Sequence, residues 1–273
     1  QEQAEVPHHL LGILDPAEQV DAAWYVEQAR AAAKEIEQRG GRVFFVGGAP
    51  FYLRALRFGL FTLPAVDPER RRALIEEAAH LGTTVLHERL RRIDPQRAAE
   101  IHPNDRYRIV RALEIHATSG LPPSELYARH RASPPPSWPR LVIGLDRPRD
   151  ELYRRIDERV ERMIEGGLVA EVAGLLSGGL SPEAPGLRAL GYRQIVAHLR
   201  GECSLSEAVA SIQRETRRFA KRQLTWFRKD PEIVWFHPEA VDAIEGAVAS
   251  FLGQPLASPT RQEERRGRGK EAG

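Results

Sequence analysis

Hydrophobic and polar positions near the start of the chain predict a helix followed by a strand. Residues from about 20 to 39 are alanine-rich and amphipathic, and Gly40-Gly41 supplies a left-handed helix stop. The run at 42–46, which is apolar from Val43 on, predicts a buried strand, and Gly47-Gly48 predicts a turn into a short helix over 50–57. This order of elements is typical of a parallel α/β sheet, in which ligands bind at the carboxyl ends of the strands.

The middle of the chain has a different pattern. Asp67-Pro68 combines an N-cap with a proline at the first helical position, and the sequence from there to about residue 131 predicts short helices without a strand. Strands are predicted again at 141–145 and 232–236, and one long helix is predicted at about 149–177. We therefore predict an α/β fold in which a helical domain is inserted into a parallel-sheet core. The predicted parts are core at 1–69, helical insertion at 70–132, core at 133–252 and a disordered tail at 253–273.

Composition excludes several classes of protein. The chain is 42% hydrophobic but has no run of about 18 apolar residues, so we expect no membrane partner. Its single cysteine, Cys203, excludes a disulfide framework and a cysteine-based zinc site. The adjacent His8 and His9 lack the spacing of metal ligands, so no metal-binding residues are predicted. No basic and apolar leader opens the chain, and we expect a cytoplasmic protein.

Positive charge is concentrated between Arg188 and Lys229. This window holds ten Lys or Arg residues and three Glu, a local net charge of +7, whereas the whole chain carries +2. Seven of these cations fall within about 140° of one face of a helix predicted to start at the capping box Ser204–Glu207. Glu207 is the only acid near that face, and the opposite face, with Ile212, Phe219 and Trp226, is predicted to pack in the core. Since like charges at i,i+4 repel, we interpret the face as a polyanion-binding surface, with a solvated amphipathic helix as the alternative.

Several short blocks of sequence carry a resemblance when they are taken together and in order. They are Val6–Leu10 with Asp15-Pro16, Gly47-Gly48 with Tyr52–Leu56, His102–Asp105 with Arg111–Glu114, Arg188–Tyr192, and Thr216-Arg217 with Ala220–Gln223 and Thr225–Arg228. These blocks closely resemble the tRNA dimethylallyltransferase family over residues 5–240. The resemblance implies a P-loop-kinase-like core with a helical insertion. It also implies transfer of a dimethylallyl group from its diphosphate to N6 of the adenosine just 3′ of the anticodon, with Mg²⁺.

The resemblance also implies roles for individual side chains. Negative charge develops on the departing diphosphate, and Arg217 and Arg222, with Lys221 beside them, are expected to stabilise it. The residues expected to hold the tRNA backbone and the displaced base are Ala49, Arg71, Tyr107, Arg108, Arg111, Arg188, Gly191, Tyr192, Arg193, Arg214, Arg218, Gln223 and Arg228. The target base must leave the stack of the anticodon loop to react. The expected partners are therefore a tRNA anticodon stem-loop and dimethylallyl diphosphate, bound by a monomer.

The sequence departs from the family pattern in two places. The family usually has a P-loop and an aspartate base ahead of the point where this chain starts, and no G-x-x-x-x-G-K-[ST] motif occurs in the 273 residues. Ala49-Pro50-Phe51 stands where the family normally has Thr-Gly-Leu, so a hydroxyl near the target nucleotide is lost. These 273 residues are therefore expected to bind RNA without transferring the dimethylallyl group.

Two other functions stay open on the sequence alone. A non-catalytic RNA-binding remnant is compatible with the absent P-loop motif. An adenylate isopentenyltransferase, which acts on a small nucleotide, is the second alternative, although a small substrate does not require a +7 window that extends over two motifs. The residues that bind a nucleotide cofactor are unknown at this stage.

Overall fold

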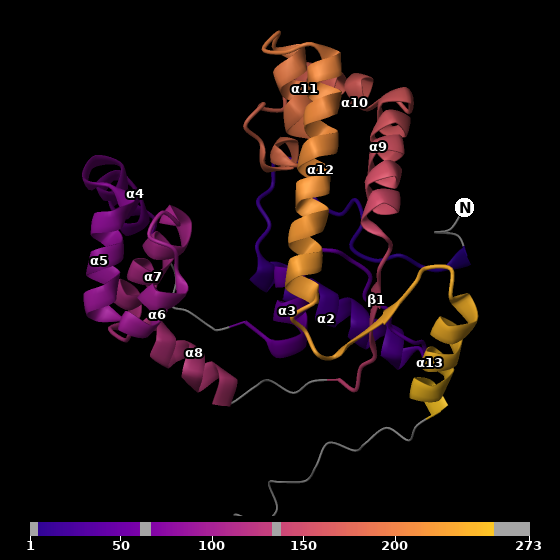
Figure 1. Ribbon diagram of the computed structural model, residues 1–273, viewed down its shortest axis with the longest axis horizontal. Coiled ribbons are helices and arrows are strands. Elements are labelled where there is room, and N and C mark those ends of the chain that lie inside the picture. The colour runs from indigo at the N-terminus through magenta and orange to yellow at the C-terminus, as the bar shows by residue number, and fades with distance from the viewer. Residues whose placement is uncertain (1–4, 61–66, 133–137, 254–273) are drawn as a thin grey trace, which may run out of the picture. The chain divides into compact units, whose positions relative to one another are not determined.

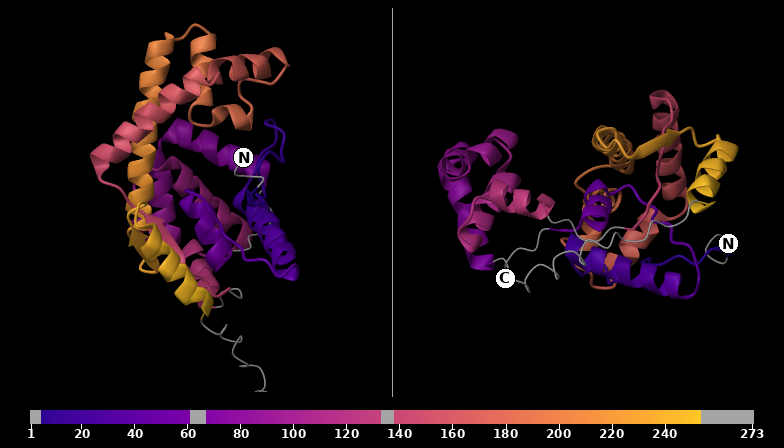
Figure 2. Two further views of the ribbon diagram at one scale, coloured as in Figure 1. Left: turned by 90° about the vertical axis from the view of Figure 1, so that its right-hand side faces the viewer. Right: turned by 90° about the horizontal axis from the view of Figure 1, so that it is seen from below.

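The computed structural model describes residues 5–60, 67–132 and 138–253. The chain divides into two compact units, of which unit 1 comprises residues 1–53 with 138–273 and unit 2 comprises residues 54–137. Helices predominate in both units (Figure 1 and Figure 2). The described helices that precede the first strand are α2 (Ala22–Gln38), α3 (Pro50–Phe58), α4 (Pro68–Leu81), α5 (Thr83–Ile93), α6 (Pro95–Glu100), α7 (Arg106–Ser119) and α8 (Pro123–Ala132). The elements that follow are β1 (Val142–Leu145), α9 (Arg149–Glu165), α10 (Leu168–Ser177), the short 3-10 helix η1 (Pro185–Arg188), α11 (Tyr192–Leu199), α12 (Leu205–Phe227), β2 (Ile233–Phe236) and α13 (Val241–Gly253).

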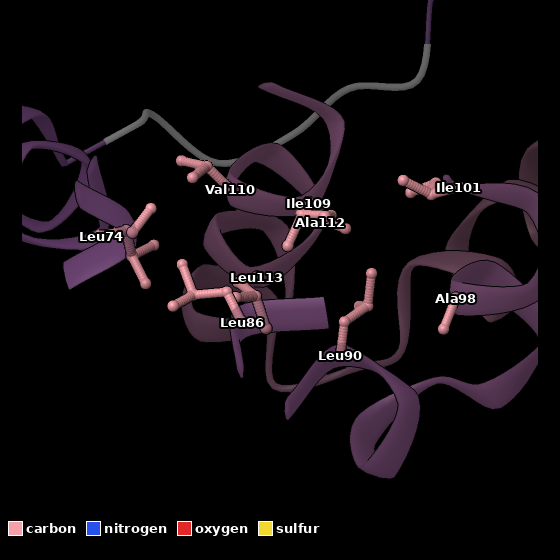
Figure 3. Close-up of a cluster of buried hydrophobic side chains, with 10 residues drawn as sticks. Leu74, Leu86, Leu90, Ala98, Ile101, Ile109, Val110, Ala112 and Leu113 are labelled. Carbon is pink, nitrogen blue, oxygen red and sulfur yellow. The ribbon is translucent and has the colours of Figure 1, made fainter. Parts of the chain in front are cut away.

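Unit 2 is organised around a cluster of apolar side chains from α4 to α7. The buried side chains are Leu74, Ala78, Leu86, Leu90, Ala98, Ile101, Ile109, Val110, Ala112 and Leu113 (Figure 3). Asp94, which is buried, ties two helix starts together. Its Oδ1 accepts from the backbone N–H of Arg97 at 2.9 Å and its Oδ2 accepts from that of Ser124 at 2.7 Å. One carboxylate therefore satisfies N-terminal donors of both α6 and α8.

Unit 1 contains a second apolar core between α9, α10, α11 and α12. The buried members are Val160, Leu168, Val172, Leu187, Ile195, Val196, Ala208 and Ile212. Helix α12 packs against both α9 and α11, and α10 packs against α11 (Figure 1). This bundle holds the basic helix at a defined position within unit 1.

Strands β1 and β2 form a two-stranded parallel sheet, which confirms both strands predicted at 141–145 and 232–236. Val142 lies opposite Ile233 and Leu145 lies opposite Phe236. Just before β1, Arg140 donates two hydrogen bonds of 3.0 Å to the carboxylate of Glu232, from Nε and from Nη2. This bidentate contact stabilises the register at the start of the sheet.

Two predictions about secondary structure are wrong. Residues 42–46 pair with no strand among the described residues, and Phe44 and Val46 are 69% and 94% exposed. Apolar composition favours a strand, but a strand also requires a neighbouring backbone to accept its hydrogen bonds. The helix predicted at 149–177 is two helices, because Gly167 adopts a φ of 96° between α9 and α10.

The C-terminal part of the described chain is the helix α13. The tail predicted at 253–273 lies outside the described residues, apart from Gly253 at the end of α13. Within the described part of the chain, no helix has both the length and the apolar character needed to cross a membrane.

Candidate functional site

The predicted basic helix is α12, and its capping box is confirmed. Ser204 Oγ accepts from the Glu207 backbone N–H at 3.3 Å, and Glu207 Oε2 accepts from the Ser204 backbone N–H at 2.8 Å. The hydrogen bond from the Ser204 backbone N–H lowers the pKa of Glu207, so an ionised carboxylate lies at the positive end of the helix dipole. Ala208 and Ile212 are buried in the core of unit 1, which turns the cationic face of the helix outward.

Two arginines on this face bind acids from elements that are distant in sequence. Arg217 Nη1 donates to Asp157 Oδ1 of α9. Arg228, the C-cap of α12, donates from Nη2 to Asp146 Oδ2 at 2.8 Å, and Asp146 directly follows β1. No local sequence pattern indicates either acid.

A third acid lies within α12 itself. The carboxylate of Glu215 is 2.7 Å from Arg218 and 4.0 Å from Arg214. The prediction that Glu207 is the only acid near the cationic face is therefore wrong. Glu215 is only one position from Arg214 and three from Arg218, and long arginine side chains reach it along the helix surface.

Three exposed cations at the C-terminal end of α12 have no acidic partner among the described residues: Lys221, Arg222 and Lys229. The guanidinium of Arg222 lies over the ring of Phe219, 5.8 Å from its centroid. An anion bound at this end of the helix would meet charges that the protein has not already neutralised. Lys221 and Arg222 are two of the three residues predicted to act on the diphosphate.

The apolar face of α12 is less buried than predicted. Phe219 and Trp226 are 41% and 40% exposed, whereas Ile212 is fully buried. The helix continues past α11 in unit 1 (Figure 1), so its C-terminal half lies beyond the helices that cover its N-terminal half. The prediction that both aromatic side chains pack in the core is wrong.

Gly47-Gly48, predicted to form a turn, lies in an irregular segment without an assigned turn, and this segment approaches the same part of α12. Gln223 Nε2 donates to the backbone carbonyl of Gly48, and a Cβ on Gly48 would clash with that amide. Ala49 is exposed, and its carbonyl accepts from the Leu53 backbone N–H at 3.1 Å to start α3. The structure thus places Gly48 and Ala49, just before α3, next to Gln223. Gln223 follows Lys221 and Arg222 in the sequence of α12.

Four other predicted residues lie around the start of α11, which Tyr192 begins. Gly191 has a φ of 101°, and its backbone N–H donates to Gln194 Oε1 at 2.9 Å. Arg188 and Arg193 line one open hollow of about 370 Å³. The other residues that line the hollow are Pro182, Leu187, Val196, Ala197, Arg200 and Glu202. The turn at Gly191 therefore presents two exposed arginines at one place.

Tyr192 is held by an acid of the neighbouring helix α10. Its hydroxyl donates to Glu171 Oε1 at 2.6 Å. This hydrogen bond, together with partial burial and the negative charge of Glu171, raises the pKa of Tyr192 above 10. The hydroxyl therefore stays neutral and oriented at physiological pH.

Unit 2 carries the remaining four predicted residues, three of them on α7. Tyr107, in the first turn, is 69% exposed, and the neighbouring Arg108 pairs with Asp105 at 2.9 Å. Arg111 Nη1 donates to Glu114 Oε2 at 2.8 Å, and Glu114 is only 1% exposed. On α4, the side chain of Arg71 is half-buried and makes no hydrogen bond or ion pair among the described residues.

Comparison with known proteins assigns the family. A family model described as IPP transferase matches residues 1–230 of the chain. The chain belongs to the IPP transferase family. A tRNA dimethylallyltransferase from Geobacter sulfurreducens is 47% identical over 251 residues, which cover 92% of this chain and 80% of that protein. A protein of the same name from Syntrophobacter fumaroxidans is 49% identical over 251 residues, covering 92% and 72% respectively.

Solved structures of the IPP transferase family have the same fold. A tRNA isopentenylpyrophosphate transferase from Bacillus halodurans matches with a TM-score of 0.63 and 35% identity, over 92% of this chain and 80% of that one. A eukaryotic dimethylallyltransferase that acts on tRNA matches with a TM-score of 0.73 at 23% identity, over 94% and 69%, and shows likeness of fold. The resemblance found in the sequence and the α/β, P-loop-kinase-like fold class are confirmed. The roles of the individual side chains stay predictions.

The described residues offer few ligands for a metal ion. Among them, no three His, Cys, Asp or Glu side chains come together in a group that could hold a metal. Asp146, Asp157 and Glu215 lie near the cationic face, but each is paired with an arginine. We therefore assign no step to a metal held by these residues.

Proposed function

We propose that the protein transfers a dimethylallyl group from dimethylallyl diphosphate to N6 of the adenosine next to the anticodon in tRNA. The observation that carries this proposal is the match of residues 1–230 to the IPP transferase family, with relatives named tRNA dimethylallyltransferase at 47% and 49% identity. Prenylation of tRNA is the activity of these relatives.

The reaction is a substitution at an allylic carbon. The bond between this carbon and the diphosphate oxygen breaks, a bond to N6 forms, N6 releases a proton to water, and diphosphate leaves with the negative charge. Because charge develops on the leaving oxygens, cations placed beside them stabilise the transition state more than the ground state. We assign this role to Lys221 and Arg222, which have no acidic partner among the described residues, and to Arg217.

The exposed cations outside this group are proposed to hold the RNA. Unit 1 exposes Arg188 and Arg193, and the start of α7 in unit 2 exposes Arg108. Tyr107 offers an exposed ring on which a base can stack. We propose that Mg²⁺ binds mainly through diphosphate oxygens and water, the coordination that this ion prefers in phosphate-transfer sites. We also propose that the protein acts in the cytoplasm as a monomer.

A direct assay tests the proposed function. The protein is incubated with Mg²⁺, dimethylallyl diphosphate and an unmodified anticodon stem-loop that carries adenosine at the target site, and the nucleosides are analysed by mass. The absent P-loop motif predicted binding without transfer for these 273 residues, whereas the family match leads us to expect transfer. The expected product is dimethylallyladenosine from this stem-loop and none from a stem-loop with guanosine at that site. Modification of adenosine monophosphate in preference to the stem-loop would support the small-nucleotide alternative. Binding of the stem-loop without transfer would support the RNA-binding remnant.

A second measurement tests the RNA surface separately. Affinity for the stem-loop is expected to fall steeply with salt, because each neutralised phosphate adds close to one unit to the slope of log affinity against log salt. Affinity that does not change with salt would contradict binding through the arginines of α7 and α11.

A further inference from the structure

The ion pair between Asp157 and Arg217 joins α9 to α12 within unit 1. Arg217 Nη1 donates to Asp157 Oδ1, and the two side chains are 36% (Asp157) and 30% (Arg217) exposed. Among the described residues, neither side chain makes another hydrogen bond or ion pair. A guanidinium has five N–H donors in a planar fork, so one corner of Arg217 is anchored and its other donors are open to a ligand.

The ion pair is not needed to hold the two helices together. Val160 of α9 and Ile212 of α12 are 2% and 1% exposed and belong to one apolar cluster. Apolar burial of this kind dominates helix packing, whereas an ion pair as exposed as this one contributes little to stability. Its main effect is to restrict the rotamers of a long, flexible arginine side chain.

Asp157 also distinguishes Arg217 from Lys221 and Arg222, the other two cations assigned to the diphosphate. Lys221 and Arg222 have no acidic partner among the described residues and therefore contribute their full positive charge. Arg217 contributes less net charge because a carboxylate lies against it, but its donors are held in one orientation. An oriented guanidinium loses less conformational freedom when it binds an oxyanion than a free one does.

We propose that Asp157 is a positioning residue that orients Arg217 toward the diphosphate of the donor substrate. This inference rests on the proposed function, in which Arg217 stabilises the departing diphosphate. Asp157 itself makes no contact with the substrate and acts through Arg217. It is separated from Arg217 by 60 positions in the sequence, which is why no local motif indicates it.

Kinetics of Asp157 variants test the proposal. Asp157→Ala is expected to lower kcat/KM for dimethylallyl diphosphate about tenfold, short of the roughly 100-fold loss that a misplacement of 1 Å can cause. Asp157→Asn keeps a carbonyl oxygen that accepts from Arg217 and is expected to recover most of the loss. Affinity for the stem-loop stays at the wild-type value in both variants. Glu158→Ala is the matched control, because Glu158 is the next residue of α9 and pairs only loosely, at 3.8 Å, with the exposed Arg154.

A double-mutant cycle separates positioning from a structural role. In an Arg217→Ala background, Asp157→Ala is expected to cause no further loss of kcat/KM, since the group through which it acts is already absent. An equal loss in both backgrounds would overturn the proposal. Wild-type kinetics of Asp157→Ala in the wild-type background would overturn it as well.

Binding of inorganic diphosphate in the presence of Mg²⁺ gives a readout that does not require transfer. Calorimetry is expected to show about tenfold weaker binding by Asp157→Ala and wild-type binding by Glu158→Ala. If the wild-type protein transfers no dimethylallyl group, the proposed function fails, and this measurement still tests the inference. The proposal is wrong if Asp157→Ala leaves the diphosphate affinity unchanged. It is also wrong if the wild-type protein binds no diphosphate, because Asp157 then positions no diphosphate ligand.

Discussion

Arg111→Ala is expected to destabilise the folded protein, in addition to removing a predicted RNA contact. Glu114 is 1% exposed, and Arg111 Nη1, at 2.8 Å, is the partner of its Oε2 atom. The Oε1 atom of the same carboxylate is buried and has no hydrogen-bond partner among the described residues. Truncation of Arg111 therefore leaves a buried carboxylate whose negative charge has lost its partner.

The size of the effect follows from the burial of the two partners. Removal of one partner of a buried ion pair costs about 3–5 kcal/mol. The side chain of Arg111 is 31% exposed, so water can enter the space that it leaves, and we expect the lower end, about 3 kcal/mol. A loss of this size in a small unit lowers the midpoint of thermal unfolding by about 12–24 °C.

Thermal unfolding followed by circular dichroism measures this change. Arg108→Ala is the matched control, because Arg108 lies on the same helix and also pairs with an acid three positions away, but its side chain is 59% exposed. Its effect on stability is expected to stay within about 0.5 kcal/mol. Combining Arg111→Met with Glu114→Leu removes both charges and is expected to restore much of the lost stability. A thermal midpoint of Arg111→Ala equal to that of the wild type would refute the reasoning.

Three further predictions concern unit 1. Gly48→Ala is expected to displace the Gln223 amide at a folding cost below about 0.5 kcal/mol, because the end of that side chain can move. The variant is also expected to slow transfer as much as Gln223→Ala does. Unchanged kinetics would exclude this hydrogen bond from the site. The hydrogen bond from Tyr192 to Glu171 stabilises the fold below pH 10 and is lost as the pH rises through the raised pKa of Tyr192. Glu171→Gln is therefore expected to lower that pKa, and an ultraviolet titration in which the pKa stays the same would contradict this. Arg222→Ala is expected to lower kcat by about 10²- to 10³-fold with little change in stem-loop affinity, whereas wild-type rates with weaker RNA binding would reassign Arg222 to the RNA backbone.

The features that sequence patterns predicted correctly act over a few residues. Ser204 caps α12 through Glu207, three positions away, and Asp67 caps α4 through the backbone N–H groups of Glu69 and Arg70. Such local hydrogen bonds depend only on residue type and spacing. The strands β1 and β2 were also predictable, because each is a short apolar run whose length is typical of a strand.

The features that sequence patterns missed require contacts between distant parts of the chain. Asp157 and Asp146 meet Arg217 and Arg228 across 60 and 82 positions, and no local spacing indicates either pair. Glu114 differs, because it lies three positions from Arg111 on one helix, and this spacing could have indicated the ion pair. Residues 42–46 have the composition of a strand, but pairing depends on a neighbouring backbone that composition does not specify.

The parallel pairing of β1 with β2 has a consequence for the order of folding. Arg140 and Glu232, which lie at the start of the two strands, are 92 positions apart, and α9 to α12 lie between them. Closing so long a segment before it is ordered is entropically unfavourable, whereas the contacts among these helices span fewer positions, 60 for Asp157 with Arg217, and form sooner. We expect the α9–α12 bundle to gain protection from hydrogen exchange before β1 does during refolding, and simultaneous protection would contradict this order. Once folded, the bundle lowers the entropic cost of bringing β1 and β2 together, because the chain between them is already ordered. The bundle that contains the cationic helix α12 therefore also favours pairing of the two strands.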